Sequence, residues 1–188
     1  MLTRDEVLHG AYGAWRLLLG DRRGLEWIDR SPMGAWRSFL LAPLLFPLDL
    51  INIGIAAQLF HSTAPWFQIV IVDLVIYAIS WAVYPLLMLG LAPMLGRERE
   101  MLGYIAVTNW CSVILSLLFT VLSLLLWIGI IPDLPATLLT FVLMAVQLVY
   151  GGFVARTALN VSLPLAAALS VAQLVLSFIL SQITFALI

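Results

Sequence analysis

The third apolar stretch of the chain, residues 104–130, reads YIAVTNWCSVILSLLFTVLSLLLWIGI and contains no charged residue. A membrane hydrocarbon core about 30 Å thick is crossed by roughly 20 apolar residues in helical conformation. Four other stretches reach this length, which predicts an all-α, polytopic membrane bundle of five transmembrane helices. We place the five spans at about residues 38–59, 66–90, 104–130, 136–155 and 164–187.

The nine arginines are distributed unevenly among the segments that connect these spans. From the N-terminal segment through the four connections to the C-terminus, the arginines number six, none, two, none, one and none. Basic residues favour the cytoplasmic side of a membrane protein, so we expect the N-terminus in the cytoplasm and the C-terminus outside. The absence of lysine is typical of GC-rich bacterial genomes and points to a bacterial inner membrane.

The composition excludes several classes of protein. With 63% hydrophobic and 10% charged residues and a mean hydropathy of +1.09, the chain has too little polar surface for a soluble globule. The net charge of -1 is uninformative because the charges are sorted by side of the membrane, and the sequence suggests no nucleic-acid partner. The two histidines, His9 and His61, fall on opposite sides of the predicted membrane, and no nucleotide-binding or zinc motif is present. We therefore expect no enzyme, no metal and no cofactor.

The N-terminal residues 1–37 form a separate cytoplasmic segment ahead of the transmembrane domain, residues 38–188. Thr3 and Glu6 have the spacing of a helix capping box, and apolar residues follow at helical intervals: Leu8, Ala11, Trp15, Leu18 and Leu19. This pattern predicts an amphipathic helix that ends near Gly20. Two placements are open: the helix packs on the cytoplasmic ends of the bundle, or it lies among lipid headgroups.

Two aspartates inside the spans need an explanation. Asp49 lies about 15 Å from either end of the first span, and Asp73 lies about 10 Å from the outer end of the second. An aspartate near the bilayer centre costs about 2.5 to 3.5 kcal/mol, and such residues usually face the protein interior. No basic residue can pair with them, so we expect neutral partners: Asn52 for Asp49, and Tyr77 with Ser80 and Tyr84 for Asp73.

Asp49, Asn52, Asp73 and Tyr77 are therefore the candidate binding or proton-linked residues. Without a cation, burial favours the neutral form of each acid, and two adjacent acids favour sharing one proton. Such a pair can serve as a proton-linked site or as a hydrogen-bonded clamp between helices. Other polar and small residues of the spans are expected to join helices: Asn109, Gln147, Gln173, Gln182, Gly151 with Ala155, and Ala168 with Ala172.

Two short stretches resemble the Yip1 superfamily of five-span membrane proteins. Residues 98–109 read EREMLGYIAVTN and enter the third span, and residues 148–159, which include the run YGGF at 150–153, link the last two spans. The resemblance implies a five-span fold with a cytoplasmic N-terminus. Eukaryotic members take part in membrane traffic and bind small GTPases. Their Asp-Leu-Tyr-Gly motif is absent here, where Asp49 and Leu50 are followed by Ile51 and Asn52.

Two hypotheses about function follow. The first is a non-catalytic, Yip1-like scaffold or accessory protein that acts through membrane lipids and a membrane-protein partner or a second copy of itself. The second is a small oligomeric transporter or proton-coupled permease that uses Asp49 and Asp73. The kink expected from Pro43 and Pro47, just before Asp49, fits the second hypothesis but also fits simple packing.

Overall fold

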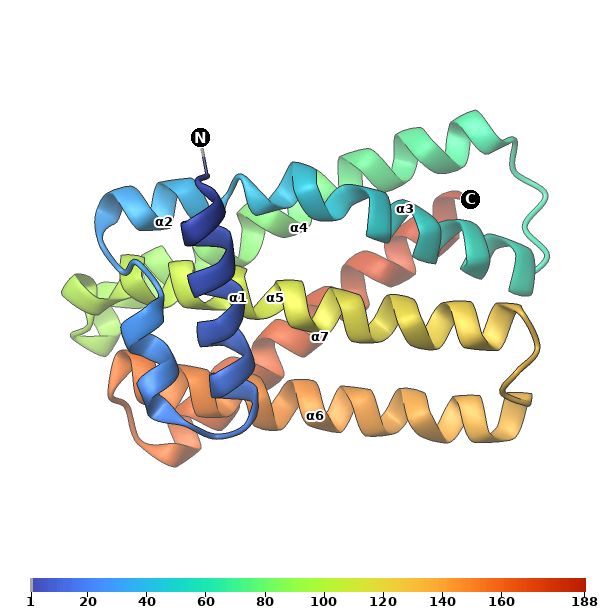
Figure 1. Cartoon of the computed structure of the whole chain (residues 1–188). Coiled ribbons are helices and arrows are strands. Elements are labelled where there is room, and N and C mark those ends of the chain that lie inside the picture. The colour runs from blue at the N-terminus through green and yellow to red at the C-terminus, as the bar shows by residue number, and fades with distance from the viewer. Residues whose placement is uncertain (1) are drawn as a thin grey trace.

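A computed structural model describes residues 2–188, with residues 133–136 described by their backbone alone, and all regular elements of the described part are helices (Figure 1). Its elements, in chain order, are α1 Arg4–Leu18, the short 3₁₀ helix η1 Arg22–Trp27, α2 Pro32–Ser38, α3 Leu41–Leu59, α4 Trp66–Leu95, α5 Glu98–Trp127, α6 Asp133–Leu159 and α7 Leu163–Leu187.

The predicted five-span bundle is confirmed as a fold. Five helical segments are long and apolar enough to cross a membrane: α2 with α3 as one segment, then α4, α5, α6 and α7. Several helices continue past the predicted spans, since α4 ends only at Gly96 in the left-handed conformation (φ 62°) and α5 starts at Glu98. Hydropathy locates the apolar part of a helix, whereas its caps decide where it ends.

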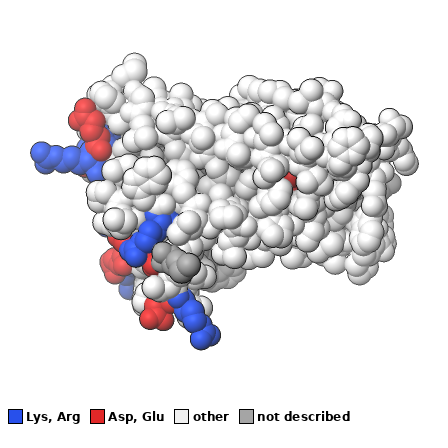
Figure 2. Space-filling model, turned by 90° about the horizontal axis from the view of Figure 1, so that it is seen from above, with Lys and Arg blue, Asp and Glu red and all other residues white. Residues whose placement is uncertain are grey.

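The two ends of the bundle differ in charge. Figure 2 shows basic and acidic side chains gathered at one end of the visible face. Elsewhere on that face a single acidic side chain is visible. We call the charged end the arginine end; there the α4–α5 turn meets the α6–α7 turn, because the Arg97 guanidinium donates to the Asn160 carbonyl. The C-terminus lies toward the other, far end, where Ser62 and Gln68 donate to the carbonyls of Ile188 and Leu187.

The protein core is concentrated at the arginine end. The first part of α5 lies between α1, α2, α4 and α6, and five of its residues are 0–2% exposed: Met101, Tyr104, Ile105, Ala106 and Val107. Toward the far end, the helices carry large exposed apolar side chains, as expected for helix faces that are covered by lipid. Of the two predicted pairs of small residues, Gly151 with Ala155 packs within the chain, since a Cβ added at Gly151 would meet Ser170 of α7 and Ala155 is buried. Ala168 and Ala172 are exposed and do not form the expected contact within the chain.

Helix α1 begins with the predicted capping box. The Thr3 hydroxyl accepts from the Glu6 amide at 3.2 Å, and the Glu6 carboxylate accepts from the Thr3 amide at 3.3 Å. The helix crosses the bundle at the arginine end instead of extending it (Figure 1), and the Tyr150 hydroxyl of α6 donates to the Ala14 carbonyl at 2.7 Å. Packing on the bundle, one of the two open placements, is therefore what the structure shows.

The face of α1 that packs is not the one expected from the large apolar residues. Gly10, Gly13, Ala14 and Leu17 are buried, whereas large apolar side chains stay exposed: Leu8, Tyr12, Trp15 and Leu19. Glycines let the helix approach closely, because a Cβ added at Gly10 would overlap the indole of Trp110 in α5. The contact is therefore made through small residues, which a search for apolar periodicity overlooks.

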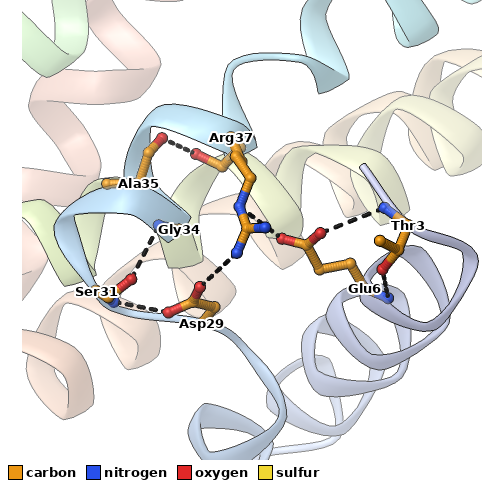
Figure 3. Close-up of polar contacts among 8 residues, drawn as sticks. Thr3, Glu6, Asp29, Ser31, Gly34, Ala35 and Arg37 are labelled. Atoms are coloured by element: carbon orange, nitrogen blue, oxygen red, sulfur yellow. Dashed lines mark hydrogen bonds and ion pairs between the residues drawn. The ribbon is translucent and has the colours of Figure 1, made fainter. Parts of the chain in front are cut away.

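Arg37 of α2 holds this N-terminal segment together (Figure 3). Its guanidinium contacts the Glu6 carboxylate of α1 at 3.1 Å and the Asp29 carboxylate at 3.1 Å. Asp29 also accepts from the Ser31 amide at 3.0 Å, and this hydrogen bond, followed by those from the Ser31 hydroxyl and Arg37, lowers the pKa of Asp29. The segment is thus a folded cap on the bundle and not a loose tail.

Replacing Gly10 with alanine is expected to destabilise the protein by about 2 kcal/mol, because the added methyl group overpacks the contact with Trp110. Thermal unfolding in detergent measures the effect. Gly90→Ala is the matched control, since a Cβ there meets nothing within 4 Å and the backbone is helical. Equal melting temperatures for the two variants would contradict the observed packing of α1.

Candidate functional site

The four candidate residues lie together inside the bundle. Asp49 and Asn52 on α3, with Asp73 and Tyr77 on α4, line one cavity of about 330 Å³, which we call the acid cavity. Asp73 is 6% exposed, and its carboxylate oxygen Oδ2 has no hydrogen-bond partner. Asp49 on α3 and Asp73 on α4 thus line the same cavity. The sequence predicted both acids, and the fold brings them to one place.

The amide nitrogen of Asn52 donates to a residue of α5 and not, as expected, to Asp49. This nitrogen donates to the hydroxyl of Thr120 on α5 at 2.9 Å, and that hydroxyl donates to the Ser116 carbonyl at 2.8 Å. Because the Thr120 hydrogen is used, Thr120 can only accept from Asn52, which fixes the orientation of the amide. The other end of the amide, Asn52 Oδ1, is left buried and without a partner.

The tyrosines and Ser80 of α4 also bond elsewhere than expected. The Tyr77 hydroxyl donates to the Ala42 carbonyl at 2.7 Å, so its single hydrogen is not available to Asp73. Ser80 donates to the Tyr77 carbonyl at 2.7 Å, and Tyr84 shares a 2.6 Å hydrogen bond with Tyr104. The predicted neutral partners therefore line the site or support its walls without satisfying the acids.

A second cavity continues the first toward the arginine end. This wide cavity has a volume of about 350 Å³ and shares six lining residues with the acid cavity: Asp49, Asn52, Tyr77, Ser80, Ser177 and Leu180. All five long helices contribute to it, and much of its lining is polar, including Thr108, Asn109, Ser112, Ser116, Gln147 and Gln173. Together the two cavities form a polar interior within the apolar part of the bundle.

Sequence reasoning missed the extent of this interior. Gln147 and Gln173, expected to join helices, line the wide cavity. Thr108, Ser112, Ser116 and Thr120 recur every four residues along α5, and α7 carries a similar series from Gln173 to Thr184. A search for hydroxyl and amide groups at helical spacing could have found these stripes. Single serines and threonines carried little signal because they also bond their own helix.

Specific contacts lie at each end of the polar interior. At the arginine end, the amide nitrogen of Asn109 donates to the fully buried Ser38 hydroxyl at 2.9 Å, and Ser38 donates to the Ala35 carbonyl. Ser38 lines a separate cavity of about 240 Å³ beneath the N-terminal cap, whereas Asn109 lines the wide cavity. At the far end, Phe185 lines the acid cavity, and the centroid of its ring lies 5.3 Å from the centroid of the Phe60 ring.

The described residues include no group of three or more histidine, cysteine, aspartate or glutamate side chains that could hold a metal ion. Comparisons with protein-family models, with curated proteins and with solved structures find no match to this chain. Function is therefore inferred from the geometry and chemistry of the two cavities.

Proposed function

We propose that this protein is a small proton-linked permease whose polar interior carries a small polar solute across the membrane. The observation that supports it most is that two residues lining one cavity, Asp73 and Asn52, each hold a buried side-chain oxygen without a hydrogen-bond partner, Oδ2 and Oδ1 respectively. A clamp between helices gains its stability by satisfying such groups, because an unpaired buried acceptor costs about 1 to 3 kcal/mol. Unpaired acceptors on residues that line a cavity are expected where a solute supplies the donors.

The acid pair gives this permease its link to protons. Two adjacent carboxyl groups without a cation favour holding one proton between them. When a solute enters the acid cavity and interacts with Asp49 and Asp73, that proton is released to water. When the solute leaves, the proton returns. Movement of solute and of protons is thereby coupled in opposite directions.

Filling the polar interior is expected to stop transport. Ser177→Phe places a ring at an exposed position that lines both cavities, whereas Val175→Phe places the same ring at an exposed position of α7 that lines neither. Liposomes that contain the purified protein and a pH-sensitive dye are exposed to a panel of small polar solutes. We expect solute-driven proton movement for the parent and for Val175→Phe, and none for Ser177→Phe.

The same measurement also tests the second candidate, a Yip1-like accessory role. The exposed apolar stripe of α1, formed by Leu8, Tyr12, Trp15 and Leu19, favours that role because it can contact lipid or a partner helix. A folded parent protein that moves no protons with any solute would contradict the permease and favour the accessory protein. Equal loss in both phenylalanine variants would show that the polar interior is not the path.

A further inference from the structure

The lining of the acid cavity restricts the chemistry of its occupant. Asp49, Asp73 Oδ2 and Asn52 Oδ1 offer acceptors, and the hydrogen of the nearby Tyr77 hydroxyl is already donated to Ala42. No arginine or lysine is among the residues that line this cavity. An occupant that satisfies these oxygens must therefore bring hydrogen-bond donors. Because it would lie near two carboxyl groups, a positively charged occupant is favoured.

The orientation of Asn52 is the second, independent observation. A free amide could turn its NH₂ group toward the acids and satisfy them. Thr120 prevents this, because its own hydrogen is donated to Ser116 and it can only accept from Asn52. The structure thus leaves the amide oxygen of Asn52 as an unpaired acceptor on a residue that lines the same cavity as the two acids. The cavity is therefore lined by residues of α3 and α4 that carry acceptors, as a group with several N–H donors requires.

The size of the cavities distinguishes an organic solute from a bare ion. The acid cavity of about 330 Å³ opens into a wide cavity of about 350 Å³, and pockets of 300 Å³ or more are typical of sites for small organic molecules. The wide cavity adds Trp81, Tyr84 and Phe119 to its hydroxyl and amide groups. Such a lining suits an organic body with apolar and polar parts.

We infer that the acid cavity binds the primary ammonium group of a small organic amine, whose body lies in the wide cavity. The inference rests on the proposed function, for which it names the substrate class. An ammonium group supplies three N–H donors, one each for Asp49, Asp73 and Asn52. The amine enters as the cation and keeps its own protons, and the proton that the two carboxyl groups shared leaves to water.

This exchange makes binding depend on pH. The acid pair faces one further titratable group, Tyr77 on α4, and neutral side chains from α7, namely Ser177, Ser181 and Thr184. Since protons and amine compete for the same carboxyl groups, amine binding is expected to weaken as the pH falls. Its dissociation constant is expected to rise about tenfold per pH unit where one proton is displaced for each amine bound.

The full chain in detergent is titrated with four probes, and binding is measured from the shift in melting temperature and by calorimetry. The probes are n-butylammonium, 1-butanol as its neutral counterpart, tetramethylammonium as a cation without N–H donors, and Na⁺. We expect only n-butylammonium to bind at millimolar concentration. Binding of Na⁺ or tetramethylammonium as tight as that of n-butylammonium, or binding of 1-butanol alone, would overturn the inference, as would no binding at all.

Thr120→Val tests the positioning of Asn52. The variant frees the amide to turn its NH₂ group toward the acids, so we expect about tenfold weaker n-butylammonium binding. Thr157→Val is the matched control, because its hydroxyl bonds only carbonyls of its own helix at the arginine end. If Thr120→Val does not fold, Asn52→Leu removes the same oxygen at similar volume. Unchanged affinity in the variant that folds would contradict the assigned site.

The binding and flux experiments can fail separately. Flux with neutral solutes but no ammonium binding would leave the permease intact and remove the amine as its substrate class. Ammonium binding that depends on Asn52, without any flux, would retain the site and remove the permease.

Discussion

Asp73→Asn is expected to reduce proton-linked flux by about a hundredfold or more, because a positioned group that transfers a proton contributes rate factors of that size. Asparagine has the shape of a protonated aspartate and keeps its place in the acid cavity, but it cannot release a proton. Flux in liposomes, measured beside thermal stability in detergent, gives the result.

The control for this substitution neutralises an acid elsewhere. Glu100→Gln changes an exposed carboxylate at the start of α5, outside both cavities, and should leave flux unchanged. Asp49→Asn should reduce flux as Asp73→Asn does, and the double variant should lose little more, because the two acids act as one unit. Normal flux in Asp73→Asn, or a loss of flux that only follows a loss of folding, would contradict the proton-linked role.

Local and compositional features of the fold could be predicted from the sequence. The five spans follow from runs of apolar residues, and the cap of α1 follows from Thr3 and Glu6, which are three residues apart. Asp49 and Asp73 could be singled out because a carboxyl group within a span is costly in itself. Each of these signals is carried by neighbouring residues, so no knowledge of the tertiary structure is needed.

Features that depend on distant residues could not be predicted. The orientation of Asn52 is fixed by Thr120, which lies 68 positions later in the chain. The packed face of α1 depends on the fit of Gly10 against Trp110, and glycine contributes nothing to an apolar pattern. Pro43, expected to kink the first span, lies in the first turn of α3, where its missing N–H breaks no hydrogen bond.

Asn109→Ala is expected to make liposomes that contain the protein several times more permeable to protons in the absence of any solute. The hydrogen bond from Asn109 to Ser38 lies between the wide cavity and the cavity beneath the N-terminal cap. Removing the amide leaves space for water at this point, and a chain of waters can then carry protons from the arginine end to the acid pair. Decay of an imposed pH gradient measures the leak.

Two further variants decide whether the leak follows this route. Gln58→Ala also removes an amide that forms a hydrogen bond between helices, because the Trp127 indole donates to Gln58. This contact lies at the exposed far end, so the variant should cause no leak. Adding Ser177→Phe to Asn109→Ala should restore a tight membrane, because Ser177 lines both cavities and the ring narrows them. A leak that persists in the double variant would mean that protons bypass the polar interior, and the Ser38 contact would then be a packing contact alone.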